Sequence, residues 1–219
     1  MDPEFWHERW TRGEIGFHQH DFNGHMQAFT HRLDLHPGAH IFVPLCGKSL
    51  DLLWLWQQGY DVTGVEISSQ AVEDFFSENQ LVARSSAIPG GQLYQAAGLE
   101  LYCVDFFTSQ FPGMADIDAV YDRAALVALP PDMRQAYARR LLGMLEPGVR
   151  ILLVTLDYPQ HEMRGPPFAV TPGEVEDLFG GSCLIEPLYQ EDCLAREPRF
   201  RKKGLTRLTE HVLLLERKP

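Results

Sequence analysis

The sequence predicts an α/β fold in which a mostly parallel, doubly wound sheet is covered by helices on both faces. Short apolar runs rich in β-branched residues alternate along the chain with segments of helical periodicity. The strand segments are apolar throughout instead of alternating with polar residues, which is typical of strands buried between two layers of helices.

The composition fits one domain with a sizeable core. The chain has 219 residues, of which 45% are hydrophobic, and no apolar run reaches the roughly 18 residues of a membrane span. The formal net charge of −11 argues against a dedicated nucleic-acid binder, which normally presents a basic face. The cysteines are widely spaced and the N-terminus lacks a secretory pattern. We therefore expect a cytoplasmic monomer with one domain, residues 1–219, and neither nucleic-acid nor membrane partners.

The N-terminal segment predicts a short helix with an aromatic face. Trp6 and Trp10 are four residues apart, so they share one side of a helix. Residues 11–25 are broken by glycines and indicate a loop, and residues 26–35 favour a second helix. Residues 1–30 are expected to form an extension folded over the domain.

From residue 40 onward, strand and helix patterns alternate. The strands are expected at residues 40–45, 61–68, 98–107, in a segment ending near Tyr121, and at 149–158, 183–192 and 210–218. The helices are expected at residues 50–59, 69–81, 130–145 and 171–180. The Gly/Pro-rich stretch "AIPGGQ" is interpreted as a connection, and the last two strands are expected to form an antiparallel pair.

Capping signals support the helix boundaries. Gly59 is a candidate C-cap of the helix at 50–59, and a serine begins the helix at 69–81. Proline stands in the first turn of the helix at 130–145. Thr171 followed by Glu174 is a capping-box signature.

The turn after the first expected strand, "PLCGKS", lies where a doubly wound sheet binds its ligand. A P-loop would need glycine in place of Phe42, and a dinucleotide fingerprint would need more glycines than Gly47. S-adenosylmethionine has no phosphate to enclose, so a single glycine is enough for it. The turn by itself leaves these three cofactors as alternatives.

Two later features favour S-adenosylmethionine. Glu66 ends the second strand, where a carboxylate can accept two hydrogen bonds from a ribose diol, although a nicotinamide cofactor carries the same diol. The helix, the "LEPG" turn and the strand at 149–158, with two further strands after them, are typical of S-adenosylmethionine-dependent methyltransferases.

One known family is matched by four segments. They are "FWHERWTRGEIGFHQ" (5–19), "FVPLCGKSLDLLWLWQQGYDVTGVEIS" (42–68), "YDRAALVAL" (121–129) and "GPPFAV" (165–170). Together they resemble the bacterial branch of the thiopurine S-methyltransferase family over nearly the whole chain. The resemblance implies a seven-stranded class I methyltransferase fold with an N-terminal helical lid. It also implies S-methylation of thiopurines and similar aromatic or heterocyclic thiols, with selenium and tellurium compounds as further acceptors.

The resemblance implies roles for particular residues. Those expected at S-adenosylmethionine, or at its product S-adenosylhomocysteine, are Trp10, Leu45, Gly47, Glu66, Asp105, Phe106 and Arg123. Those expected at the substrate are Phe17 and a C-terminal arginine, Arg196 or Arg199. No essential general base is expected, because a soft sulfur nucleophile ionises near neutral pH. No metal is expected, because His18 and His20 lack a third ligand at a suitable spacing.

Simpler explanations stay open for several of these residues. Trp10 could pack an N-terminal helix onto the core, and Arg123 beside Asp122 could form a surface ion pair. Cys46 has no acid–base partners in the pattern that would make it a nucleophile. The basic stretch at 196–204 is interpreted as a solvated loop. A binding module without turnover and a nicotinamide-dependent oxidoreductase remain alternative functions.

Overall fold

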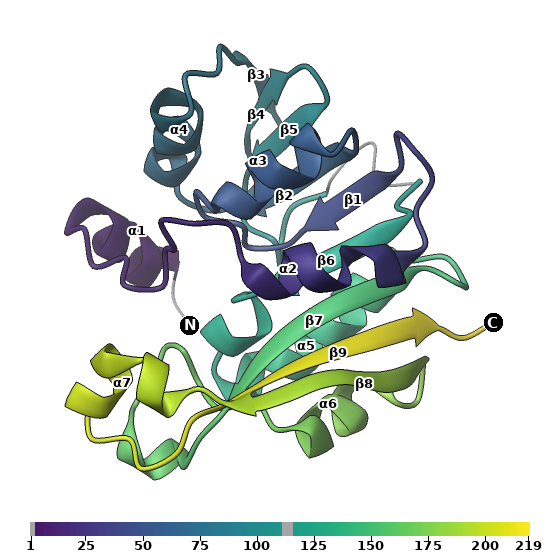
Figure 1. Ribbon diagram of the computed structural model, residues 1–219. Coiled ribbons are helices and arrows are strands. Elements are labelled where there is room, and N and C mark those ends of the chain that lie inside the picture. The colour runs from purple at the N-terminus through teal and green to yellow at the C-terminus, as the bar shows by residue number, and fades with distance from the viewer. Residues whose placement is uncertain (1–2, 111–115) are drawn as a thin grey trace. The chain divides into compact units, whose positions relative to one another are not determined.

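The structure, a computed structural model, describes residues 3–110 and 116–219 (Figure 1). The chain forms two units, Met1–Tyr121 and Asp122–Pro219, and the division falls inside strand β6 (Ala119–Arg123). Each of the seven strands predicted from the sequence has a counterpart among the described residues.

The sheet of the first unit has a parallel centre. Its strand order is β3-β4-β5-β2-β1-β6, and β2 pairs in parallel with both β1 and β5, while β1 also pairs in parallel with β6. The central strands are β1 (His40–Val43), β2 (Asp61–Glu66) and β5 (Leu99–Cys103). Because parallel strands end at the same edge, the residues after β1, β2 and β5 lie beside one another.

An additional hairpin occupies the outer edge of this sheet. Strands β3 (Arg84–Ile88) and β4 (Gly91–Ala96) pair antiparallel with each other, and β4 pairs antiparallel with β5. The prediction of a plain connection here was wrong, and only Pro89 and Gly90 lie between the two strands. Arg84, Ser85 and Ser86 of β3 are polar, and every residue of the strand except Ile88 is exposed, so β3 lacks the apolar pattern that signals a strand.

Side-chain caps begin the helices of the first unit. Its helices are α1 (Pro3–Thr11), α2 (Gly24–Phe29), the 3-10 helix η1 (Thr30–Leu33), α3 (Leu50–Gln57) and α4 (Ser69–Glu78). Ser49 and Ser68 cap α3 and α4 by accepting hydrogen bonds from the backbone N–H groups of Asp51 and Ala71. Gly59 has φ 88 just after α3, as expected at a helix end.

The second unit has an antiparallel sheet. Strand β9 (Thr209–Arg217) lies between β7 (Arg150–Asp157) and β8 (Cys183–Asp192) and pairs antiparallel with both, as predicted for the closing strands. Its helices are α5 (Pro131–Leu142), α6 (Pro172–Phe179) and α7 (Pro198–Lys202), with short 3-10 helices η2 (Leu126–Ala128), η3 (Gln160–Glu162) and η4 (Leu194–Arg196). Figure 1 shows α5 and α6 on one face of these three strands.

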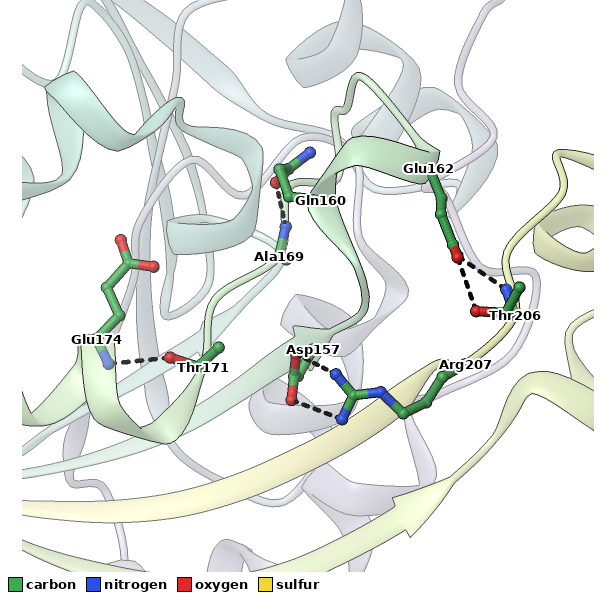
Figure 2. Close-up of polar contacts among 8 residues, drawn as sticks. All are labelled: Asp157, Gln160, Glu162, Ala169, Thr171, Glu174, Thr206 and Arg207. Carbon is green, nitrogen blue, oxygen red and sulfur yellow. Dashed lines mark hydrogen bonds and ion pairs between the residues drawn. The ribbon is translucent and has the colours of Figure 1, made fainter.

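Polar contacts order the loops that follow β7 (Figure 2). Thr171 Oγ1 accepts a hydrogen bond from the backbone N–H of Glu174 at 3.1 Å, which confirms the predicted cap of α6. Gln160 Oε1 accepts one from the backbone N–H of Ala169 at 2.9 Å. The segment between β7 and α6 is therefore fixed by hydrogen bonds between its side chains and backbone N–H groups.

Two further pairs of residues in Figure 2 connect the segment before β9 to the end of β7 and to η3 (Gln160–Glu162). The carboxylate of Glu162 accepts hydrogen bonds from the N–H and the hydroxyl of Thr206, at 2.9 and 2.7 Å. Arg207 directs both terminal nitrogens at Asp157, with each N–O distance at 3.3 Å. These bonds lower the pKa of Glu162, chiefly through the backbone N–H of Thr206.

The basic stretch is more ordered than the sequence indicates. Residues 196–204 were expected to be a solvated loop, but Pro198–Lys202 form the one-turn helix α7. Phe200 is the anchor, because its ring is 3% exposed and packs in a cluster with Tyr158 and Leu208. The arginine and lysine side chains of α7 are exposed, so the solvated part of the prediction holds.

No helix in the described part of the chain is long and apolar enough to cross a membrane.

Candidate functional site

The site is built on the turn between β1 and α3. The backbone N–H of Cys46 donates to the carbonyl of Val65 at 2.9 Å, so the turn is fixed to the end of β2. Leu45 and Gly47 both lie in the left-handed region, with φ 45 and φ 54. A left-handed leucine costs about 1–2 kcal/mol, and such strain persists only where the surroundings fix the backbone. The turn is thus a rigid, locally strained element at the carboxyl end of the sheet.

Glu66 closes the turn from the neighbouring strand. Its Oε2 accepts a hydrogen bond from the backbone N–H of Gly47 at 2.9 Å, and its Oε1 accepts one from Ser68 at 2.8 Å. Burial raises the pKa of Glu66, and the backbone N–H bonds oppose that rise. Each carboxylate oxygen has a second lone pair, so Glu66 can hold the turn and still accept hydrogen bonds from a ribose diol.

Trp10 covers the turn from the N-terminal helix. Its side chain is 4% exposed, and a Cβ placed on Gly47 would lie 3.1 Å from Trp10 Cζ2. That contact is closer than ordinary van der Waals distance, so both the φ angle and the indole favour glycine at 47. Helix α1 also packs against α4 (Figure 1). Trp10 therefore does pack its helix onto the core, and the place where it packs is the turn predicted to hold the cofactor.

Phe17 belongs to the same aromatic cluster. Its ring meets those of Trp10 and Trp6 edge to face, with centroids 5.6 and 5.8 Å away. Phe17 and Trp6 are half-buried, while Trp10 is buried. The cluster offers flat apolar surface beside the turn, which suits a heteroaromatic ring.

Asp105 and Phe106 follow β5 at the same edge of the sheet. The carboxylate of Asp105 accepts hydrogen bonds from the N–H of Phe107 at 2.7 Å and the hydroxyl of Thr108 at 3.0 Å. The ring of Phe106 is 1% exposed and stacks on Phe42, with centroids 6.4 Å apart. Phe106 is thus a core residue by position, and its predicted place beside adenine stays a prediction.

The remaining residues of the turn have structural partners. Lys48 is 8% exposed, and its Nζ bonds Glu78 at 2.6 Å and Asp74 at 3.4 Å on α4. Burial alone would lower the pKa of Lys48, but these two carboxylates raise it above the ordinary value. Burial also raises the pKa of the Cys46 thiol, which keeps it protonated and a poor nucleophile. Lys48 is therefore held by the carboxylates of α4 and does not point outward as a phosphate-binding lysine would.

In the second unit, Arg123 ends β6 next to a buried carboxylate. Asp122 is 1% exposed, and its Oδ2 accepts a hydrogen bond from the Tyr137 hydroxyl at 2.6 Å. Because the Asp122 carboxylate is buried, it does not form a surface ion pair with Arg123. Sequence reasoning missed Asp122 and Tyr137, because their contact spans fifteen residues and no local pattern announces it.

The C-terminal arginines are exposed. Arg196 forms an ion pair with Glu191, and Arg199 pairs with Glu197 at 3.0 Å while its guanidinium lies over the Phe200 ring. A role for Arg196 or Arg199 at the substrate remains a prediction from the family resemblance.

The burial of Asp122 predicts that the free energy of unfolding depends on pH. Burial raises the pKa of Asp122 to about 6, and hydrogen bonds from Tyr137 and from backbone N–H groups oppose the rise. The folded-state pKa of Asp122 lies above the usual 3.8, so Asp122 stabilises the fold fully when the pH is below 3.8. This contribution to the free energy of unfolding is lost as the pH rises through about 6. The loss is about 3 kcal/mol, at 1.36 kcal/mol per pKa unit.

Urea denaturation of the wild type and Asp122→Asn at pH values of about 4 and about 7 measures this loss. The free energy of unfolding of the wild type, relative to Asp122→Asn, should fall as the pH rises. Asp132→Asn, at an exposed site on α5, is the control. A difference between wild type and Asp122→Asn that is the same at both pH values would contradict the prediction.

Comparison with a solved structure defines the class of protein. The chain matches 1,6-didemethyltoxoflavin-N1-methyltransferase of Burkholderia thailandensis, solved with 1,6-didemethyltoxoflavin and S-adenosylhomocysteine, at a TM-score of 0.64. The two sequences are 16% identical, and the match covers 99% of this chain and 87% of that one. The fold is that of the S-adenosylmethionine-dependent methyltransferases, as the sequence predicts.

Comparison with sequences defines the family. The thiopurine S-methyltransferase family model matches residues 1–218. The thiopurine S-methyltransferase of Nitrosospira multiformis is 48% identical over 215 residues, covering 98% of each chain. That of Shewanella oneidensis is 48% identical over 218 residues, covering 100% of each chain. The chain belongs to the thiopurine S-methyltransferase family, whose members use S-adenosylmethionine as the methyl donor.

Proposed function

We propose that the protein transfers a methyl group from S-adenosylmethionine to the sulfur of thiopurines and similar aromatic or heterocyclic thiols. The observation that carries this proposal is the identity of nearly half of all residues, over the full length, with relatives named thiopurine S-methyltransferase. The family match over residues 1–218 also supports treating residues 1–219 as one methyltransferase domain. The packing of Trp10 on Gly47 supports residues 1–30 as its lid.

The residues of the first unit fit S-adenosylmethionine. When bound, this cofactor supplies a methyl carbon made electrophilic by the neighbouring sulfonium charge. Glu66 would accept hydrogen bonds from the ribose hydroxyls, and Leu45 and Gly47 would lie along the methionine end. The turn that contains both residues contacts Glu66 and Trp10 through Gly47.

The chain has little covalent work to do in this reaction. Its contribution is to orient the acceptor sulfur in line with the methyl carbon and to exclude water. Trp10 and Phe17 would supply apolar, flat surface for both tasks. A thiopurine sulfur ionises near neutral pH, so we expect no residue to act as an essential general base.

A methyl-transfer screen with labelled S-adenosylmethionine tests the proposal. The acceptors are a thiopurine, an aromatic thiol, an aliphatic thiol, selenite and tellurite, and the thiopurine and the aromatic thiol should be methylated fastest. Transfer to selenite or tellurite would extend the acceptor range to selenium and tellurium compounds. Calorimetric binding of S-adenosylhomocysteine with no transfer to any acceptor would favour a binding module, and binding of NADH would favour an oxidoreductase.

We propose in addition that the protein works as a monomer. Light scattering with and without S-adenosylhomocysteine measures the mass in solution. A mass near twice the 24.9 kDa of one chain would contradict this part of the proposal.

A further inference from the structure

The end of β6 is bound to helix α5 through Asp122, the next-to-last residue of the strand. Tyr137 donates its hydroxyl to Asp122 Oδ2 at 2.6 Å, and the other oxygen, Oδ1, accepts the N–H of Leu126 at 3.2 Å. Both Asp122 and Tyr137 are almost fully buried, at 1% and 0% exposure. One carboxylate thus connects the strand end, the turn and the helix.

The last residue of the same turn is bound to the same helix. Arg134 lies one helical turn before Tyr137, and its Nε donates to the carbonyl of Leu129 at 2.9 Å. Its Nη1 donates to Glu174 of α6 at 2.5 Å, and its side chain is 1% exposed. Residues 122–129 are therefore attached to α5 at both ends.

The middle of the turn has a third attachment and a strained backbone. The N–H of Phe168 donates to the carbonyl of Val127 at 2.7 Å. Ala124, directly after Arg123, has φ 76, a left-handed conformation that non-glycine residues adopt only where the surroundings impose it. The backbone conformation around Arg123 thus depends on these attachments.

Stability alone does not account for the Asp122–Tyr137 pair. A buried carboxylate and a buried hydroxyl lose their hydration, and apolar residues of the same size would fill the space without that cost. A phenylalanine at 137 would keep nearly all of the packing. What the hydroxyl adds is a fixed position for Asp122, and with it a fixed position for the next residue, Arg123.

We propose that Tyr137, acting through Asp122, is a positioning residue that sets Arg123 for cofactor binding. The inference rests on the proposed function and on the role at S-adenosylmethionine that the family resemblance implies for Arg123. Tyr137 itself touches neither cofactor nor substrate, so its effect must pass through Arg123.

A double-mutant cycle tests this, with Tyr137→Phe, Arg123→Lys and the two combined. The dissociation constant for S-adenosylhomocysteine is measured by calorimetry, and the KM and kcat are measured with a thiopurine acceptor. Tyr137→Phe should weaken binding about 3- to 10-fold in the wild-type background and less than about 2-fold beside Arg123→Lys, since residues that act as one unit are not additive. Leu141→Val, buried on the same helix but outside the turn, is the control for stability and should leave the affinity unchanged.

Four outcomes overturn the proposal. Tyr137→Phe could weaken binding equally in both backgrounds, or no more than Leu141→Val does, and either result makes Tyr137 a purely structural residue. Alternatively, Arg123→Lys could leave the affinity unchanged while the wild type binds S-adenosylhomocysteine, which removes Arg123 from the cofactor but keeps the proposed function. Failure of the wild type itself to bind S-adenosylhomocysteine would overturn both.

Discussion

Replacing Glu66 with glutamine should weaken the binding of S-adenosylhomocysteine by about 1–3 kcal/mol, because a charge-assisted acceptor becomes a neutral one. The amide has one acceptor oxygen where the carboxylate has two, and Glu66 already uses both oxygens for the N–H groups of Gly47 and Ser68. The amide NH2 would face one of those N–H donors. The substitution therefore affects the ligand and the turn together.

Calorimetry with S-adenosylhomocysteine measures the affinity, and urea denaturation of the same samples measures any loss of stability. Glu73→Gln, at an exposed carboxylate on α4, is the matched control and should bind like the wild type. An unchanged dissociation constant for Glu66→Gln would remove Glu66 from the cofactor site. A loss confined to stability would assign Glu66 to the turn alone.

Replacing Trp10 with alanine should lower the free energy of unfolding by about 3–5 kcal/mol if the first unit unfolds as a whole, as for other buried tryptophans. The indole is 4% exposed and fills the space above Gly47, so its loss leaves a cavity between α1 and the turn. Because Trp10 also meets Phe17 edge to face, the half-buried Phe17 loses one of its ring contacts.

Limited proteolysis distinguishes this lid from a passive extension. Cofactor and substrate together should protect the first 20 or so residues of the wild type, and the protection should be lost in Trp10→Ala. Glu8→Gln is the control, because Glu8 lies on the same helix and is exposed. Equal cleavage of the wild type with and without ligands would contradict a lid, whatever the stability of the variants.

The sequence predicts those parts of the fold whose signals are local. Apolar runs identify the strands of the parallel centre, and the cap formed by Thr171 on Glu174 is visible as a four-residue pattern. The β3–β4 hairpin escapes prediction because β3 is mostly exposed and begins with three polar residues, while β4 mixes exposed Gln92 and Gln95 with half-buried residues. Neither strand has a continuous apolar run. Helix α7 escapes it because a single buried ring, Phe200, orders an otherwise basic segment.

The candidate site divides in the same way. The turn at 44–49 and Glu66 follow from strand periodicity and chain order, so both are found from the sequence. The packing of Trp10 on Gly47 joins residues 37 positions apart, and no local pattern encodes such a contact. The buried state of Asp122 depends on Tyr137 of a later helix, which is why a surface ion pair was a reasonable but wrong alternative.

The hairpin at the sheet edge also bears on how the protein behaves at high concentration. Strand β3 is the outermost strand of the first unit, so one side of its backbone offers hydrogen-bonding groups on which a strand from another molecule could assemble. Arg84, Ser85 and Ser86 are exposed along it, and a charged, hydroxyl-bearing edge resists such fibril-like addition. Apolar substitutions at Ser85 and Ser86 would remove this protection and leave a template for aggregation without altering the methyltransferase fold.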